Sequence, residues 1–409
     1  MEYSLDKIVI VGGGTAGWLS ALYLNSKFKN SKITLIESDE IGILGAGEGT
    51  TGNIVKFLNN LGISPDDMIN NCEATFKTGI DFENWTKPGS IFTHPIDYKP
   101  KGDGYAYHFN ARLLVKYLKS LAIERGVNWI EGIVTEPILN DTNQIIGLKT
   151  IDTMIDASFV IDCSGFKRLL IGNHYKSNWI SYEEHLKVNT AIPFFLPTNS
   201  INSRTTTKSI AMKYGWMWQI PLQSRRGCGY IFDSTEISED EAKKEIIEFL
   251  GADVDIQFNK PIKFKPGSYE NVWIENCLAI GLSGGFLEPL EATSIMTTIL
   301  QLEAFYDTTL KKMTLKKYNK FVNTINTQNM IFIYYHYLTN RTDSTFWKKV
   351  SAAAADLPYP LDLLIDSSYN FKPKKQLVEL FEKDSTIIFG SFSYNKINKG
   401  IKQTQPPLI

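Results

Sequence analysis

A stretch in the second half of the chain combines a glycine-rich turn with a helix start that could hold an anion. Residues 278–300 read LAIGLSGGFLEPLEATSIMTTIL, which is a short apolar run, a turn and a helical pattern that begins near Pro289. Proline suits a first helical turn because its missing N–H is not needed there. The free N–H groups of a helix start attract anions, so an anion or the edge of an electron-rich heterocycle is expected near residues 291–294. The alternative is an ordinary strand-to-helix connection.

Lys77 is a second candidate. It lies in ATFKTGIDFENW (residues 74–85), where Phe76, Ile80 and Phe82 alternate as on the apolar face of a half-buried strand. Lys77 therefore falls on the other face, and without further context it reads as a solvated lysine. His94, in a turn before Pro95, either lines a pocket or packs in the interior, and we expect it to line a pocket.

Two tryptophans form a third candidate. The segment GWMWQIP (residues 215–221) places Trp216 and Trp218 on one face of a strand that Pro221 ends. An indole N–H is costly to bury without a partner, so a wall beside a planar ligand is one interpretation. Ordinary packing of a β-layer is the other.

The N-terminal segment carries a glycine-rich turn between a predicted strand and a predicted helix. An apolar run at residues 7–11 leads into GGGTAG (residues 12–17), a helical segment follows, and a second strand at residues 32–36 ends in Glu37. In this G-x-G-x-x-G pattern Gly12 allows the tight turn, Gly14 lets the backbone approach a pyrophosphate, and Gly17 permits close packing of helix on strand. Glu37 can accept hydrogen bonds from ribose hydroxyls. The pattern predicts dinucleotide binding, with a coincidental glycine turn as the alternative.

The glycine pattern does not distinguish FAD from NAD. A strand ending at VIDCSG (residues 160–165) and the turn at Gly281 suit a bulky flavin nucleotide that is wrapped by several turns. The segment GAGEGTTG (residues 45–52) precedes a helix near Asn53 that Thr50 or Thr51 can cap, and an ordinary capped helix is the alternative interpretation. No second G-x-G-x-x-G is present, so we expect no separate nicotinamide site. The electrons that reduce a flavin would then come from outside this protein. The residues that we assign to the cofactor are Gly12, Gly14, Thr15, Ala16, Gly17, Glu37, Gly47, Gly49, Thr50, Asp162, Gly281 and Leu287.

Composition narrows the class of partner. The 409 residues are 43% hydrophobic and 12% aromatic with a net charge of −1, which argues against a nucleic-acid or membrane surface and favours a small organic substrate. Four cysteines are scattered without C-x-x-C spacing, no basic and apolar leader is present, and no apolar run approaches the roughly 20 residues that span a bilayer. We expect a cytoplasmic protein with reduced cysteines.

The remaining pattern suggests how these candidates are positioned. Residues 105–119 read as a helix that Asn110 can cap, residues 182–264 read mainly as strands with one helix at 239–250, and the chain beyond residue 300 turns helical. The sequence thus predicts an α/β fold with an added β-layer and a helical C-terminal region.

At this point the sequence closely resembles the flavin-dependent halogenases of the tryptophan halogenase type. The matching stretches follow the family's order and cover most of the chain. G-W-x-W-x-I-P is more specific than the nucleotide fingerprint, because FAD hydroxylases of similar fold lack it. The stretches are VGGGTAGW (11–18), FKTGIDFENW (76–85), YAYHFNARL (105–113), GWMWQIP (215–221), GLSGGFLEPLEATSI (281–295) and HYLTNRTDSTFW (336–347).

The resemblance implies a fold and its division. The fold class would be α/β, with an FAD-binding Rossmann-like core of the PHBH (aromatic hydroxylase) type. Residues 1–180 and 270–310 would form the FAD-binding module, 181–269 a β-rich insertion covering flavin and substrate, and 311–409 a helical C-terminal substrate cap, shortened relative to the family.

The resemblance also implies a reaction. FADH2 and O2 would form a flavin hydroperoxide, and a halide ion would attack it to give hypohalous acid. Lys77 would receive this oxidant, by hydrogen bonding or as a haloamine, and present it to an electron-rich aromatic ring. Glu291 would position the oxidant and take the proton that the ring loses, with Lys77 and Glu291 as neighbours.

The same resemblance assigns the surroundings. The halide would lie near the backbone of Thr293 and Ser294, and Trp216, Trp218, Pro221 and His94 would wall the flavin from the substrate. No metal is expected. A separate flavin reductase would supply FADH2, and a homo-oligomer is compatible with the sequence.

Two departures bear on the substrate. The chain ends soon after residues 392–394, where tryptophan-specific members are longer, and the linker between His94 and Tyr105 looks short. An open pocket would favour phenols, indoles or related heteroaromatics with relaxed selectivity, and larger halides such as bromide or iodide. Two other classes stay open, an FAD-dependent aromatic monooxygenase and a flavin-binding protein without catalysis. Product mass separates the first from a halogenase, and flavin turnover separates the second.

Overall fold

The computed structural model describes residues 4–40, 42, 48–96, 104–197, 205–251, 256–352 and 388–402. Three features considered above lie outside these ranges. They are Gly47, most of the linker before Tyr105, and residues 353–387 and 403–409 of the expected C-terminal cap.

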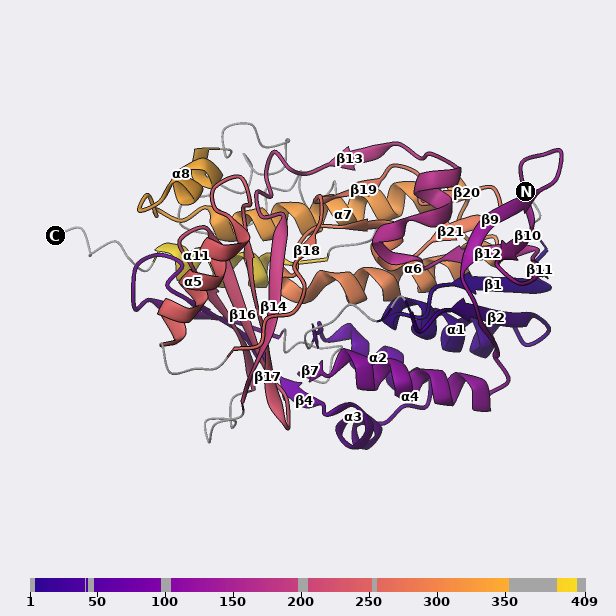
Figure 1. Cartoon of the computed structure of the whole chain (residues 1–409), viewed down its shortest axis with the longest axis horizontal. Coiled ribbons are helices and arrows are strands. Elements are labelled where there is room, and N and C mark those ends of the chain that lie inside the picture. The colour runs from indigo at the N-terminus through magenta and orange to yellow at the C-terminus, as the bar shows by residue number, and fades with distance from the viewer. Residues whose placement is uncertain are drawn as a thin grey trace.

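A six-stranded sheet carries the N-terminal glycine turn (Figure 1). Its strands pair in parallel except at the β20 edge, and the residues of β1 and β12 are almost all buried, as expected for strands covered on both faces. The order is β20 (Trp273–Ile274), β21 (Cys277–Ala279), β12 (Phe159–Asp162), β1 (Lys7–Val11), β2 (Lys32–Glu37) and β8 (Asn128–Glu131).

A seven-stranded sheet carries the two tryptophans and is antiparallel except where β15 pairs with β5. It includes two strands, β5 and β6, that precede residue 181 in the chain. The order is β18 (Ile262–Lys263), β14 (Thr190–Pro197), β17 (Arg225–Phe232), β16 (Gly215–Pro221), β15 (Thr206–Ala211), β5 (Gly79–Glu83) and β6 (Ile91–Pro95).

Three small sheets complete the described strands. The first is β3 (Glu48–Gly49), β7 (Ala106–Phe109) and β4 (Thr75–Lys77), the second is β13 (Trp179–Ser181), β19 (Gly267–Tyr269) and β22 (Gly285–Phe286), and the third is β11 (Met154–Asp156), β10 (Ile145–Thr150) and β9 (Val134–Leu139).

Figure 1 shows α6 and α7 running across the molecule from the six-stranded sheet toward the seven-stranded sheet. The helices of the described chain are α1 (Thr15–Lys27), α2 (Asn53–Asn60), α3 (Pro65–Cys72), α4 (Ala111–Glu124), α5 (Glu239–Leu250), α6 (Thr293–Thr309), α7 (Leu315–Tyr337), α8 (Thr345–Ala352) and α11 (Ser391–Lys402). Among the described residues, none of these helices has the length and apolarity that a bilayer crossing requires.

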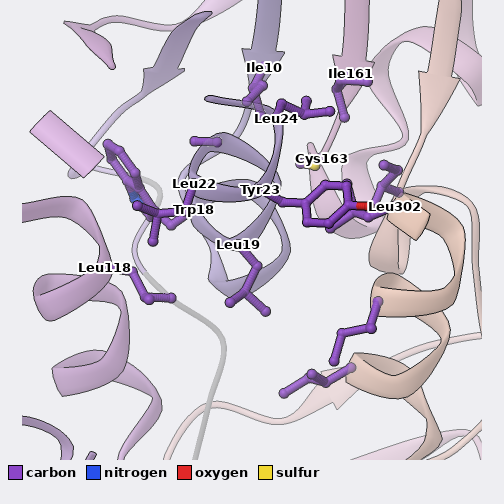
Figure 2. Close-up of a cluster of buried hydrophobic side chains, with 14 of the residues drawn as sticks. Ile10, Trp18, Leu19, Leu22, Tyr23, Leu24, Leu118, Ile161, Cys163 and Leu302 are labelled. Atoms are coloured by element: carbon purple, nitrogen blue, oxygen red, sulfur yellow. The ribbon is translucent and has the colours of Figure 1, made fainter. Parts of the chain in front are cut away.

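The largest buried cluster surrounds α1. Figure 2 shows Trp18 and Leu118 on the α4 side of this helix and Leu302 on the α6 side, with Ile10 and Ile161 from the sheet above it. Because α1 is covered by the sheet and by two helices, its first turn is fixed relative to the strand that precedes it. The glycine turn is therefore held between buried elements.

One predicted helix begins later than expected. Residues 105–119 were expected to be helical, but β7 takes up Ala106–Phe109 and α4 starts only after Asn110. Asn110 caps α4 as predicted, since its side chain accepts hydrogen bonds from the backbone of Arg112 and Leu113. The preceding residues are drawn into a strand because they pair with both β3 and β4. The helix predicted at residues 239–250 is confirmed as α5.

Candidate active site

A cavity of about 980 Å³ extends from the glycine turn of the six-stranded sheet to the tryptophans of the seven-stranded sheet. Its lining includes most of the residues singled out above. They are Gly12, Gly14, Thr15, Ala16, Glu37, Gly49, Lys77, Trp216, Trp218, Gly281, Glu291, Thr293 and Ser294. Residues that lie more than 200 positions apart in the sequence thus share one pocket.

The glycine turn has the shape of a dinucleotide cradle. Gly12 has φ of +112°, and a Cβ there would lie 2.3 Å from the Cys163 carbonyl oxygen. A Cβ on Gly17 would lie 1.9 Å from the Gly12 oxygen, whereas a Cβ on Gly14 would meet nothing within 4 Å. Helix α1 has no side-chain cap, so its first N–H groups are free for an anionic ligand. Each glycine therefore fits the role predicted for it.

Glu37 stands beside this turn at the end of β2. Its carboxylate accepts hydrogen bonds from the indole N–H groups of Trp18 (3.3 Å) and Trp129 (3.1 Å), and Lys119 forms an ion pair with it at 2.7 Å. These partners fix the carboxylate at the cavity wall. A ribose that bound Glu37 would share or replace these contacts.

Helix α4 presents a basic face to the same part of the cavity. Arg112, Lys116 and Lys119 follow one another at spacings of four and three residues, so they lie on one side of the helix, and all three line the cavity. Three cations near the uncapped start of α1 favour a ligand with a diphosphate.

Lys77 is almost completely buried, with 1% of its surface exposed. Its Nζ donates to the carbonyl oxygen of Thr50 at 3.0 Å. Burial lowers the pKa of Lys77 to about 8, and the negative charge of Glu291 limits the decrease. Near neutral pH the side chain can therefore exist as the ammonium or as the nucleophilic amine.

His108 lies next to Lys77 and is neutral. Burial and the charge of Lys77 hold its pKa well below the ordinary value. The Thr75 hydroxyl donates to the Pro221 carbonyl at 2.7 Å, so His108 Nδ1–H donates to Thr75 and His108 Nε2 accepts from the Thr207 hydroxyl at 2.8 Å. The histidine thus adds no second positive charge beside the lysine.

The backbone at Glu291 is strained. Glu291 and Ala292 have φ of 63° and 56°, in the left-handed region of backbone conformation that residues other than glycine rarely adopt. These two residues lie in a short 3-10 turn (Leu290–Ala292) that precedes α6. Because the left-handed residues interrupt the helix, α6 begins at Thr293, a few residues later than the sequence pattern near Pro289 suggested. This reversal brings the Glu291 side chain and the uncapped start of α6 to the same cavity.

Two histidines hold the Glu291 carboxylate. His94 Nδ1 lies 2.9 Å from both carboxylate oxygens, and His336 Nε2 lies 2.8 Å from Oε1. His336 Nδ1 lies 2.7 Å from the Phe332 carbonyl oxygen, which only accepts, so its proton is on Nδ1. Nε2 then donates a hydrogen bond to Oε1 of the ionised carboxylate. Burial raises the pKa of Glu291, but the two histidines outweigh it and hold the pKa well below the ordinary value.

The tryptophans stand on β16 as predicted. Their ring centroids are 6.1 Å apart with the rings inclined at 61°. Trp216 donates its indole N–H to Glu288 Oε1 at 3.1 Å, which supplies the partner that burial requires. The Trp218 ring lies flat against Gly229 of β17, where a Cβ would come within 2.1 Å of the ring.

Several predicted site residues lie behind the cavity wall. Asp162 directs both carboxylate oxygens at backbone N–H groups of residues 164–171, and Pro221 receives the Thr75 hydroxyl. Thr50 supports Lys77 through its carbonyl group. His94 contacts Glu291 without lining the large cavity, and Leu287 lines a smaller cavity beside it. Gly17 lies in the turn as a packing residue.

Several polar residues of the site were not assigned from the sequence, the basic residues of α4 among them. Glu48, Thr207 and Glu288 line the large cavity, and His336 holds Glu291. Burial raises the pKa of Glu48 to about 7. Glu288 and His336 lie inside stretches that carried the family resemblance, which is the signal that could have found them. Thr207 sits in a strand without a distinctive pattern. In the part of the chain that the structure describes, no group of three or more His, Cys, Asp or Glu could hold a metal ion.

The chain is similar to known proteins over most of its length. The family described as "Tryptophan halogenase" matches residues 7–102 and 97–403. The tryptophan 7-halogenase RebH of Lentzea aerocolonigenes is 31% identical over 420 residues, which covers 85% of this chain and 79% of RebH.

Solved structures are similar over nearly the whole chain. The tryptophan 6-halogenase SttH of Streptomyces toxytricini superimposes with a TM-score of 0.87 at 28% identity, covering 96% of this chain and 89% of SttH. BrvH, a flavin-dependent halogenase from Brevundimonas sp. BAL3, gives a TM-score of 0.80 at 27% identity, covering 97% of this chain and 90% of BrvH.

Proposed function

The chain belongs to the tryptophan halogenase family of flavin-dependent enzymes, and on this premise we propose that it halogenates an electron-rich aromatic or heteroaromatic small molecule with FADH2, O2 and a halide ion. One observation supports the assignment most directly. Lys77 and Glu291 are both buried, line one cavity and act on each other electrostatically. A structural lysine has no reason to lie in such a place, because burial of its charge is unfavourable.

The cavity residues fit an FAD molecule. Gly12 and Gly14, the free start of α1 and the basic face of α4 would hold the diphosphate, and Glu37 would face the ribose. When bound, FADH2 would supply the two electrons that reduce O2 to the oxidation level of peroxide. Oxygen at this level would oxidise a halide ion to hypohalous acid, with water as the other product. In this proposal residues 1–180 and 270–310 hold the flavin, residues 181–269 cover it, and residues 311–409 cap the substrate.

Lys77 and Glu291 would then act on the oxidant and on the ring. As an ammonium, Lys77 would donate a hydrogen bond to hypohalous acid, and as an amine it would accept the halogen as a haloamine. Its pKa of about 8 makes both routes accessible. Glu291, kept ionised by His94 and His336, would accept the proton that leaves the ring when aromaticity returns.

The halide would lie at the start of α6, near the backbone of Thr293 and Ser294. Both residues line the cavity, and α6 has no side-chain cap to occupy its free N–H groups. Trp216 and Trp218 would separate flavin from substrate, so that halide and not the organic ring meets the activated oxygen.

The substrate class has two parts in this proposal. Tryptophan is the first compound to test, because several similar proteins are tryptophan halogenases. The range would also include phenols, other indoles and heteroaromatics, and bromide or iodide beside chloride. We further propose a separate flavin reductase as the source of FADH2, action in the cytoplasm, and a homo-oligomer as a state to examine.

Mass spectrometry of the products tests the proposal. The reaction would contain the protein, FAD, an NADH-driven flavin reductase, mixed halides, and a panel of aromatics that includes tryptophan. We expect halogenated products that disappear in Lys77→Ala and fall in Glu291→Gln. Lys208→Ala is the matched control, because Lys208 is also largely buried but pairs with Glu83 and does not line the cavity.

Other products would overturn the proposal. Hydroxylated products that do not depend on halide would indicate an aromatic monooxygenase. Reduced flavin that binds without being consumed would indicate a flavin-binding protein without catalysis. Strict chlorination of free tryptophan would keep the halogenase and remove the relaxed range.

A further inference from the structure

The carboxyl group of Glu288 has one satisfied and one unsatisfied oxygen. Oε1 accepts hydrogen bonds from Trp216 Nε1 at 3.1 Å and from the Tyr337 hydroxyl at 2.9 Å. Oε2 is buried and has no hydrogen-bond partner among the described residues. The side chain as a whole is 2% exposed, so bulk solvent does not reach this oxygen and a ligand or a water molecule inside a cavity must complete it. Such a group is unfavourable unless a ligand completes it.

The partners of Glu288 indicate that it is a neutral acid. Oε1 already receives two donors, so the proton of a carboxylic acid resides on Oε2. No ion pair to Glu288 occurs in the described part of the chain, and an ionised carboxylate without a cation would be costly at this depth. Burial raises the pKa of Glu288 to about 8, although its hydrogen bonds from Tyr337 and Trp216 oppose the increase. At neutral pH Oε2 is therefore a hydrogen-bond donor.

Glu288 lines a second cavity of about 20 Å³ that adjoins the start of α6. Thr293, Ser294 and Thr297 line it from α6, and a volume of this size holds one water molecule or one monatomic ion. Thr297 Oγ1 accepts a bond from Asn329 and so keeps its own proton to donate. The uncapped N–H groups of α6 are donors as well.

The lining of this small cavity is therefore rich in donors. An acid O–H and a hydroxyl that can donate belong to residues lining this monatomic space, and the uncapped start of α6 lies beside it. This set of donors suits an anion better than a cation. The left-handed backbone of residues 291–292 maintains the free helix start next to it. Strain of this kind persists where the surrounding structure and a function maintain it.

We propose that Glu288, as an uncharged carboxylic acid, donates a hydrogen bond from Oε2 to the halide ion at the start of α6. The inference rests on the proposed halogenation, because halide is the anion which that reaction consumes. Trp216 and Tyr337 position the acid by occupying Oε1. Trp216 lines the large cavity and, through its hydrogen bond to Glu288, would also position the group that donates to the halide.

Chloride NMR line broadening on the FAD-loaded protein at about pH 7 tests this inference without turnover or aromatic substrate. We expect Glu288→Gln to bind chloride like the wild type, because its amide oxygen accepts from Trp216 and Tyr337 while its N–H replaces the acid proton. Glu288→Met, which removes the donor, should bind on the order of tenfold more weakly, as expected for loss of a hydrogen bond to a charged group. Tyr334→Phe is the matched control and should retain chloride affinity, because Tyr334 lies on the same helix α7, donates its hydroxyl to the Val350 carbonyl and lines neither cavity.

Two measurements keep the test interpretable. Glu288→Met leaves the Trp216 and Tyr337 donors without an acceptor, so thermal unfolding and FAD absorbance must show that the variant folds. If it does not fold, the double variant E288M/Y337F removes one of these stranded donors and is used in its place.

Unchanged chloride affinity in the folded Met variant, or a wild type that does not bind chloride, would overturn the inference. Failure of the proposed function looks different. A wild type that binds chloride in a Glu288-dependent way but yields no halogenated product would refute the halogenation and leave the anion site standing.

Discussion

His336→Leu tests the arrangement around Glu291 most directly. The substitution removes the hydrogen bond from Nε2 to Glu291 Oε1 and leaves His94 as the remaining hydrogen-bond partner of the carboxylate among the described residues. Leucine keeps the apolar packing against Phe82 and Phe332, which contact the His336 ring. The change therefore acts mainly on the charge of Glu291, and His336 acts on the reaction by positioning that group.

The size of the effect follows from the burial of both partners. His336 is fully buried and Glu291 is 4% exposed, so solvent does not screen their contact. A hydrogen bond to a charged group contributes about 1.5–3 kcal/mol, and 1.36 kcal/mol corresponds to about one pKa unit. Burial alone raises the pKa of Glu291, so loss of His336 should raise this pKa by about one to two units from its lowered value. The free energy of unfolding should fall by about 1.5–3 kcal/mol.

The sign of the pH dependence distinguishes charge from packing. A carboxylate whose pKa is lowered by folding contributes stability that is present above its unfolded pKa, about 4.3, and is lost as pH falls toward the folded pKa. The unfolded-state titration is common to both proteins. The difference between wild type and variant in urea unfolding, followed by tryptophan fluorescence, should therefore be fully present near pH 5.5 and narrow only below about pH 3.5, as pH falls through the raised folded pKa of the variant. This range lies below the ordinary titration of histidine.

The rate of halogenation supplies the second readout. The variant should lose about tenfold or more in kcat, and His336→Gln should recover part of the loss because its amide can donate to Glu291. His174→Leu is the control, since His174 is partly exposed and does not line the cavity. A stability difference that stays constant with pH would mean that His336 only packs. An unchanged kcat would refute the role assigned to Glu291.

Three further predictions concern other walls of the cavity. Lys77→Met should abolish product yet raise the free energy of unfolding at pH 7 by roughly 3 kcal/mol. Burial lowers the pKa of Lys77 from 10.5 to about 8, so the charged lysine destabilises the folded protein until pH exceeds 10.5. Urea unfolding at pH 7 and at pH 10.5 should show that the extra stability of the variant becomes smaller at the higher pH. Gly229→Ala should displace the Trp218 ring and lower the free energy of unfolding by about 1–3 kcal/mol. The variant should also release more hydrogen peroxide per halogenated product, as measured by a peroxidase assay. An unchanged ratio of peroxide to product would argue against Trp218 as a wall between flavin and substrate. FAD binding should weaken in Arg112→Ala and in Lys116→Ala, and its affinity should depend less on salt concentration than in the wild type. Fluorescence titrations at several salt concentrations measure both effects. The same salt dependence in variants and wild type would mean that these side chains do not contact the diphosphate.

The sequence alone determined the elements that depend on near neighbours. The turn of Gly12, Gly14 and Gly17 and the cap of α4 at Asn110 could be read directly, because tight turns and caps are made within a few residues. The two tryptophans on one strand followed from the alternation of β16. The family resemblance carried Lys77 and Glu291 into one site, beyond what the spacing of either residue indicated.

Tertiary structure decided what those residues face. Alternation placed Lys77 on a polar strand face, but the fold buries it beneath Thr50, and only that burial brings its pKa near 8. His94 and His336 meet at Glu291 from positions 197 and 45 residues away, which no local pattern encodes. Pairing with β3 and β4 likewise made a strand of residues that read as helix. Hydrogen bonds, burial and charge all depend on groups that the folded chain brings together. The pKa values and hydrogen-bond partners of the site residues could therefore be derived only from the tertiary structure.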